Sequence, residues 1–250
     1  MAVKMKVLLT NDDGIQSVGL KIVAEWAQKH FDEVVVCAPK TQQSGKSHAI
    51  NIHQPIEITR TDYCVPNIRA YSVDSTPVDC VRYATLGLKE HYDLIISGIN
   101  KGYNLGEDIL YSGTVGAIFE TSLRGMRGIA LSTEYTSFQT AEAWLESVYR
   151  FFVDNKLFDY NDTYNVNIPL ETKGILTTKM GGAYYTDDFI AADETHFHQE
   201  GYMVYRFGSD LTIDTDATMN GYISVTPLSI KRDNPEAYRR IAKNIGENKD

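Results

Sequence analysis

Short apolar runs alternate with segments of helical periodicity through the first 150 residues of this 250-residue sequence. Each run is rich in Val, Ile, Leu or Ala, has the length of a strand and stops at a polar residue, glycine or proline. Strands that are apolar on both faces have to be covered on both faces, as in a parallel sheet between two layers of helices. We therefore expect buried strands at residues 6–10, 33–38, 68–73, 93–97 and 128–132.

The segments between these runs carry helix signals. Apolar residues recur at helical spacing, and Thr76 followed by Pro77 gives an N-cap and a first-turn proline. We expect helices at residues 18–30, 77–88, 114–124 and 140–152. The predicted fold class is therefore α/β, with a Rossmann-like, mostly parallel sheet and helices on both of its faces.

The character of the sequence changes near residue 175. Residues 184–207 mix aromatic and polar side chains, and Gly201 lies between two runs that could pair, which indicates an extended β-hairpin. A last strand is expected at residues 221–228, and Asn234 with Pro235 predicts a C-terminal helix. We expect a Rossmann-like core over residues 1–175 and a hairpin, strand and helix extension over residues 176–250, as parts of one domain.

Composition excludes several classes of protein. The apolar runs are far shorter than the roughly 20 residues of a membrane helix, and the first residues resemble a strand rather than a signal peptide. A formal charge of -9 argues against general binding of nucleic-acid polymers. The three cysteines are an odd number without metal-type spacing, which favours a reducing compartment. We expect a cytoplasmic protein without membrane contact.

The first predicted strand ends on two adjacent acidic residues, Asp12 and Asp13, followed by Gly14. Neighbouring side chains on a strand point to opposite faces, so both carboxylates can reach one point only where the chain has left strand geometry. A hard divalent cation would relieve the repulsion between them. The same four residues, NDDG, also fit a solvated turn that caps the following helix, and the motif alone leaves both interpretations open.

Two further loops leave the same edge of the predicted sheet, where ligands bind in open α/β folds. The loop after the second strand supplies Ser44, a neutral oxygen ligand, and Gly45, a candidate phosphate contact. The loop over residues 98–114 is rich in glycine and asparagine and leads into a helix, which is typical of an anion site. It is neither a Walker loop nor a dinucleotide fingerprint.

Several motifs together resemble the SurE family of metal-dependent nucleotidases, also called survival-protein acid phosphatases. They are LLTNDDG near the start, SGINKGYNLGEDILYSGTVGA at 97–117, NVNIP at 165–169 and SVTPL at 224–228. The resemblance implies a Rossmann-like core, one divalent metal cation such as Mg²⁺ or Mn²⁺, nucleoside monophosphate substrates, and dimers or tetramers that exchange the C-terminal hairpin and helix. It implies metal ligands at Asp12, Asp13, Ser44 and Asn100, and phosphate contacts at Asn104, Ser112, Gly113 and Thr114.

The expected reaction is that of a 5′-nucleotidase, in which a metal-activated water attacks phosphorus and Asp12 or Asp13 accepts its proton. Two alternatives remain. An aspartyl-phosphate phosphatase would use Asp12 as nucleophile, although such enzymes usually separate their two acids by one residue. A nucleotide-binding protein without catalytic activity could use the same fold.

Overall fold

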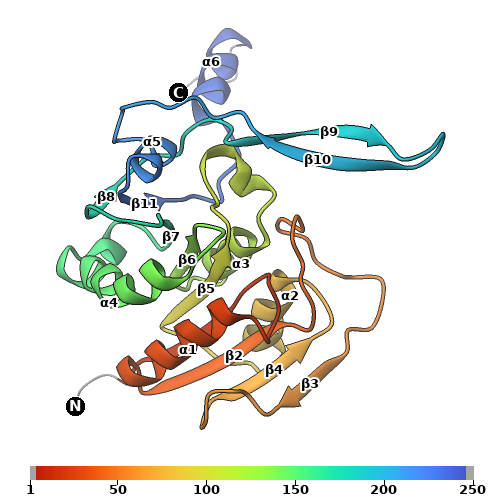
Figure 1. The fold of residues 1–250 in the computed structure, drawn as a ribbon, viewed down its shortest axis with the longest axis vertical. Helices are drawn as coiled ribbons and strands as arrows, with labels where there is room; N and C mark the ends of the chain where they lie inside the picture. The colour runs from red at the N-terminus through yellow and green to blue at the C-terminus, as the bar shows by residue number, and fades with distance from the viewer. Residues whose placement is uncertain (1–3, 246–250) are drawn as a thin grey trace.

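The computed structural model describes residues 4–245, and its centre is a nine-stranded sheet (Figure 1). From one edge to the other the strands are β3 (Ile58–Thr61), β4 (Arg69–Val73), β2 (Glu33–Pro39), β1 (Lys6–Thr10), β5 (Leu94–Lys101), β6 (Gly128–Thr133), β7 (Thr163–Ile168), β11 (Ile223–Pro227) and β8 (Ile175–Thr177). The six strands from β4 to β7 are parallel, β3 pairs antiparallel with β4, and β11 pairs antiparallel with β7 and parallel with β8. The predicted α/β class with a mostly parallel sheet is confirmed.

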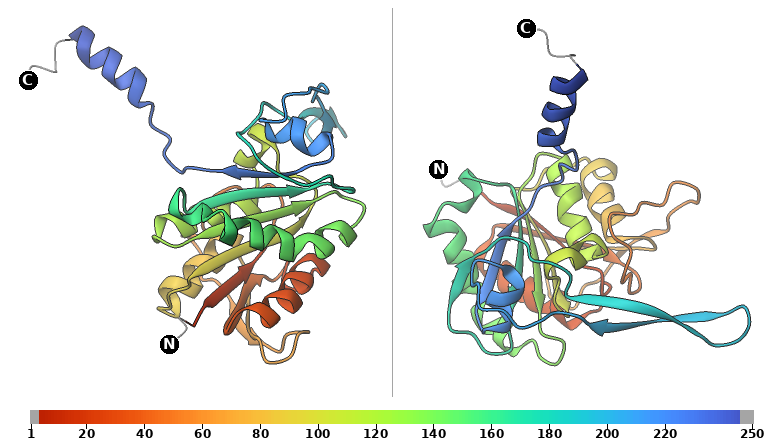
Figure 2. Two further views of the ribbon diagram at one scale, coloured as in Figure 1. Left: turned by 90° about the vertical axis from the view of Figure 1, so that its left-hand side faces the viewer. Right: turned by 90° about the horizontal axis from the view of Figure 1, so that it is seen from above.

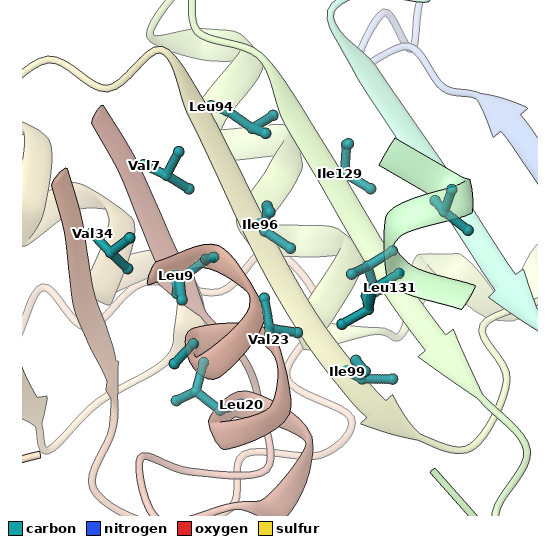
Figure 3. Packing of buried hydrophobic residues seen from close by; sticks show 14 of the residues in the cluster. Val7, Leu9, Leu20, Val23, Val34, Leu94, Ile96, Ile99, Ile129 and Leu131 are labelled. Carbon is teal, nitrogen blue, oxygen red and sulfur yellow. The ribbon is translucent and has the colours of Figure 1, made fainter. Parts of the chain in front are cut away.

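Helices cover both faces of the sheet. On one face α1 (Val18–His30) and α4 (Gln139–Asp154) pack on side chains such as Leu9 and Ile96 (Figure 3). On the other face α2 (Pro77–Arg82) and α3 (Gly113–Leu123) pack on side chains such as Leu8 and Ile95. Consecutive residues of one strand thus enter different cores, because strand side chains alternate between faces.

The five strands predicted between residues 6 and 132 and the four predicted helices lie where the sequence predicts them, within a few residues at each end. The predicted helix through Leu88 divides into α2 and a single π-helical turn, η1 (Tyr83–Gly87). The strand predicted at 93–97 extends to Lys101, so it carries Asn100. Two short 3-10 helices, η2 (Gly106–Leu110) and η3 (Leu157–Asp159), complete this part of the chain.

The C-terminal part contributes both to the sheet and to two projections. Strands β8 and β11 and the short helix α5 (Asp214–Met219) join the body, whereas β9 (Tyr185–Ala191) and β10 (Phe197–Met203) form a separate antiparallel hairpin. Figure 2 shows this hairpin and α6 (Pro235–Ile245) extending away from the body. We call the hairpin the arm. Every residue of its two strands is exposed.

The predicted role of Gly201 in the arm is wrong. It lies inside β10, opposite Asp187, and the turn is formed by residues 192–196. Asp193 stabilises that turn, because its Oδ1 accepts hydrogen bonds from the backbone N–H groups of Thr195 (2.7 Å) and His196 (2.8 Å). An aspartate can therefore supply the turn chemistry that was expected of glycine.

The root of the arm is fastened to η2. The carboxylate of Asp108 accepts hydrogen bonds from the backbone N–H groups of Tyr184 (3.4 Å) and Tyr185 (3.0 Å). Beside it, buried Asp214 accepts from the N–H groups of Gly106 (3.0 Å) and Gly181 (2.7 Å). Two carboxylates therefore hold the segment before β9 against the loop that leads into α3.

Candidate functional site

The polar loops predicted from the sequence meet at a topological switch point of the sheet. Strand β1 has β2 on one side and β5 on the other, and Thr10, its last residue, pairs with Ser97. The chain runs outward from β1 to β2 in one direction and to β5 in the other. A crevice opens at the carboxyl ends of strands where the order reverses in this way, and ligands of open α/β sheets bind there.

The motif NDDG divides its tasks between the asparagine and the aspartates. Asn11 makes the turn, because its Nδ2 donates to the carbonyl oxygen of Gly14 (3.0 Å) and to Oγ of Ser17 (2.6 Å). Ser17 is itself the N-cap of α1. The turn interpretation thus holds for Asn11, whereas Asp12 and Asp13 make contacts with other elements.

Asp12 is buried against the start of α3. Its Oδ1 accepts a hydrogen bond from the hydroxyl of Thr114 (2.6 Å), and only 5% of the residue is exposed. Burial raises the pKa of Asp12 to about 6; the Thr114 hydrogen bond opposes this shift and the charge of Asp13 adds to it. Among residues 4–245 no lysine, arginine or histidine forms an ion pair with Asp12, so no described protein cation compensates its negative charge.

Asp13 points toward the end of β5. Its Oδ2 accepts from the backbone N–H of Lys101 (3.3 Å), and burial raises its pKa while Lys101 opposes the shift. The pairing of β5 with β6 is irregular between Ser97 and Asn100. Gly98 makes this possible, because its φ is +135° and a Cβ would lie 2.2 Å from the carbonyl oxygen of Leu131.

The irregularity in β5 brings Asn100 to the same rim as Asp13. The Nδ2 of Asn100 donates to the carbonyl oxygen of Gly102 (2.8 Å). This bond fixes which end of the amide is used internally and leaves Oδ1 as the oxygen that Asn100 offers to a ligand. The predicted metal ligand thus has the correct atom available.

Ser44 and Gly45 belong to a loop that crosses from β2 to the site. Its near end is tied down by the backbone N–H of Gln43, which donates to the carbonyl oxygen of Asp12 (2.7 Å). Ser44 is exposed, and its Oγ accepts from Nε2 of Gln42 (3.0 Å). Gly45 lines a cavity of about 670 Å³ that also borders η2 and the root of the arm.

The start of α3 adjoins Asp12 directly. Ser112 is the N-cap, with its Oγ accepting from the N–H of Val115 (3.1 Å). A Cβ at Gly113 would lie 3.1 Å from Cβ of Asp12, so the carboxylate and the helix start are in contact. The first N–H groups of a helix lack intrahelical partners and attract anions, and Ser112, Gly113 and Thr114 supply this end of α3.

Asn104, a predicted phosphate contact, is held by residues for which no role was predicted. Its Nδ2 donates to Oγ of Ser132 (2.7 Å), and its backbone N–H donates to Oδ1 of Asn167 (2.8 Å). Its carbonyl oxygen accepts from Nδ2 of both Asn165 (2.7 Å) and Asn167 (2.9 Å). These contacts fix the loop before α3. The signal in the sequence was the NVNIP motif, where two asparagines share one face of a strand.

The donor set fits a hard divalent cation. Two adjacent carboxylates, an amide oxygen and a hydroxyl are the oxygen ligands that Mg²⁺ and Mn²⁺ accept. Within residues 4–245 no group of three or more His, Cys, Asp or Glu side chains is arranged to hold a metal. A cation at this rim would therefore need the neutral oxygens of Ser44 and Asn100, with water or phosphate oxygens completing its coordination.

Asp12 should make the metal-free protein less stable as pH rises. Its pKa is about 6 when folded and near 3.8 otherwise, so the folded state binds more protons between these values and the free energy of unfolding falls with pH. Asp12→Asn should therefore raise the Tm of EDTA-treated protein at neutral pH and flatten this slope. Thermal unfolding between about pH 4 and pH 8 measures it, and an unchanged slope in Asp12→Asn would contradict the assignment.

Comparisons with known proteins agree with the architecture and the motifs. The model of the family described as Survival protein SurE matches residues 7–187. A 5′-nucleotidase SurE of Natranaerobius thermophilus is 34% identical over 257 residues, covering 95% of this chain and 98% of the relative. One from Clostridium botulinum is 37% identical over 239 residues, covering 90% and 92%. The crystal structure of the SurE protein from Aquifex aeolicus superposes with a TM-score of 0.77 at 29% identity, covering 96% and 99%. The chain belongs to the SurE family.

Proposed function

We propose that this protein is a 5′-nucleotidase, a phosphomonoesterase that hydrolyses nucleoside monophosphates to nucleoside and phosphate. The names of its relatives support this activity. The observation that carries the proposal is the hydrogen bond between Thr114 and Asp12, which joins a carboxylate suited to a cation with a helix start suited to a phosphate. A phosphate ester bound there contacts both.

One divalent cation, Mg²⁺ or Mn²⁺, is the proposed cofactor, held by Asp12, Asp13, Ser44 and Asn100. When bound, such a cation polarises a phosphoryl oxygen and lowers the pKa of a coordinated water. The protein's part is to keep two carboxylates ready for it. Thr114 fixes the orientation of Asp12, and the backbone of Lys101 fixes Asp13.

The residues at the start of α3 act on the phosphoryl group. The N–H groups of Gly113 and Thr114 and the hydroxyl of Ser112 hold its oxygens, and the positive end of the helix stabilises charge as it redistributes. Asp12 and Asp13 are the titratable groups beside it, so one of them accepts the proton of the attacking water.

The nucleoside occupies the cavity of about 670 Å³ beside the phosphate position. Tyr111 and Tyr185, both exposed, line it and offer faces on which a base can stack. Its ionisable lining is acidic, from Glu107, Asp108 and Asp187, which disfavours a second phosphate. The cavity therefore supports monophosphates as substrates over diphosphates and triphosphates.

The test is release of inorganic phosphate from the 5′-monophosphates of adenosine, guanosine, cytidine and uridine with Mg²⁺ or Mn²⁺. Turnover that stops in EDTA and returns on adding either cation supports the proposal. Binding of the nucleotides without turnover in any cation would instead favour a nucleotide-binding protein, the alternative left open by the fold.

The arm and α6 are proposed to join subunits into a homodimer or homotetramer. Large apolar side chains are exposed on both, which is unusual for a surface without a partner. They are Phe189, Ile190, Phe197, Tyr202 and Met203 on the arm, and Tyr238, Ile241 and Ile245 on α6.

Within residues 4–245 no helix is long and apolar enough to cross a membrane. The cysteines are free thiols, which supports the cytoplasm as the proposed location.

Charges placed on the arm should dissociate the oligomer. Phe189→Asp combined with Phe197→Asp removes two exposed aromatic side chains. Burial of these side chains between subunits would contribute hydrophobic free energy to assembly, and the double variant loses it. Light scattering coupled to gel filtration should give a multiple of the single-chain mass for the wild type and one chain for the double variant. Gln199→Glu adds charge to the same arm without removing apolar surface and should leave the mass unchanged. A wild type that elutes as one chain would refute the assembly.

A further inference from the structure

The loop that carries Ser44 is attached at its far end by Ser47, which bonds to the end of η2 and lies against α3. The backbone N–H of Ser47 donates to the carbonyl oxygen of Tyr111 (3.0 Å), and the hydroxyl of Ser47 donates to the carbonyl oxygen of Leu110 (2.6 Å). Its own carbonyl oxygen lies against Gly116, where a Cβ would approach within 2.2 Å. The loop backbone thus rests directly on the first turns of α3, next to the proposed phosphate position.

His48, the next residue, adds a side-chain attachment. Its Nε2 lies 3.2 Å from Oε2 of Glu120, which is on α3 two turns after the helix start. The side chain of Glu120 is only 3% exposed. The other oxygen of Glu120, Oε1, forms ion pairs with guanidinium nitrogens of Arg82 (3.0 Å) and Arg124 (2.6 Å).

The two oxygens of Glu120 therefore have different roles, because Oε1 binds the arginines and Oε2 binds His48. The arginines already compensate the buried charge, so His48 is not needed to keep the carboxylate paired. What His48 contributes is a link between the Ser44 loop and the helix. Ser44, Gly45 and Lys46 are exposed and lie between two anchors, Gln43 on one side and Ser47 with His48 on the other.

We propose that His48 is a positioning residue, which through Glu120 holds the Ser44 loop on α3 and so sets the affinity of the site for its metal. The inference rests on the proposed role of Ser44 as a metal ligand. Ser47 and His48 share the far anchor, so loss of His48 loosens this end of the loop; the ordering that then accompanies cation binding costs conformational entropy, which is subtracted from the binding free energy. The same contact fixes the position of the Ser44 loop, which faces the metal, relative to the start of α3, which faces the phosphate.

His48→Ala tests the proposal, with binding of Mn²⁺ alone to the metal-free protein as the readout, measured by calorimetry or electron paramagnetic resonance. We expect the Kd for Mn²⁺ to rise about tenfold, the lower end of the loss seen when residues that orient metal ligands are removed. At saturating Mn²⁺, kcat should stay close to the wild-type value. His48→Gln, which can still donate to Glu120, should recover most of the affinity.

His53→Ala is the matched control, because His53 is an exposed histidine five residues along the same loop. It should leave the Kd unchanged. Ser47→Ala removes another attachment of the same loop, and its effect on the Kd should combine non-additively with that of His48→Ala. If the fold of His48→Ala is impaired by circular dichroism, Ser47→Ala and His48→Gln decide the question.

The two proposals can fail separately. A wild type that binds Mn²⁺ together with a His48→Ala variant of equal affinity would overturn the positioning role and leave the proposed function intact. Equal losses in His48→Ala and His53→Ala would also overturn it. A wild type that binds no Mn²⁺, or binds it as well after Ser44→Ala, would overturn both the metal assignment of Ser44 and the inference that depends on it.

Discussion

Asp13→Asn is expected to lower kcat/KM for nucleoside monophosphates by about 10³-fold, because several kcal/mol of metal-derived stabilisation of the transition state is lost. The substitution keeps the size of the side chain and an oxygen that can accept from the N–H of Lys101, so the loop retains its anchor. What disappears is one of the two negative charges that attract the cation. Steady-state phosphate release at several Mn²⁺ concentrations measures the loss.

A matched control is Asp62→Asn, an exposed aspartate just after edge strand β3, which should leave kcat/KM unchanged. Near wild-type activity in Asp13→Asn would exclude the metal role of this residue. Rapid-quench labelling with a radioactive substrate addresses the aspartyl-phosphate alternative. An acid-stable, hydroxylamine-sensitive phosphoenzyme that is absent from Asp12→Asn would replace attack by water with attack by Asp12.

Gly116→Ala should also lower kcat/KM by about 10²-fold, the loss that follows when a reacting group is misplaced by roughly 1 Å. In an isolated helix the change would stabilise by about 1 kcal/mol, since alanine favours helix more than glycine does. Here a Cβ would stand 2.2 Å from the carbonyl oxygen of Ser47, so the loop must move off α3. The Kd for Mn²⁺ and kcat/KM measure the displacement of Ser44.

Gly182→Ala provides the comparison for Gly116→Ala, because a Cβ at Gly182 meets no atom within 4 Å. It lies beside the loop that leads into α3, yet it should change neither metal affinity nor turnover. If Gly116→Ala retains the wild-type Kd for Mn²⁺, the contact between Ser47 and α3 has no part in positioning Ser44. Circular dichroism of both variants checks that any loss comes from displacement and not from unfolding.

The parts of the fold that follow from local patterns were predictable. Strands such as residues 6–10 are apolar on both faces, and Thr76 with Pro77 marks a helix start without reference to distant residues. Asp12 and Asn100 could be assigned to one rim because parallel strands end on the same side. These inferences need only periodicity, capping and the direction of the chain.

Other parts depend on partners far away in the sequence. Strand β7 was not predicted, because Asn165 and Asn167 are polar residues that belong in a buried strand only once Asn104 is there to bond with them. Periodicity likewise gives no sign that Gly116 must be small, since the cause is the backbone of Ser47. The pairing of His48 with Glu120 spans 72 residues and is visible only in the folded chain.

The attachment of the arm at Asp108 has a consequence for how this protein can vary. Tyr184 and Tyr185 are fixed to η2, but the strands beyond them touch solvent along their whole length. Insertions or deletions at the tip, residues 192–196, therefore change the reach of the arm while the catalytic loops stay in place. Changes at Tyr184 or Tyr185 would instead displace η2, which precedes α3. The reach of the arm can thus diverge between relatives independently of the chemistry, provided that its first two residues keep their anchor.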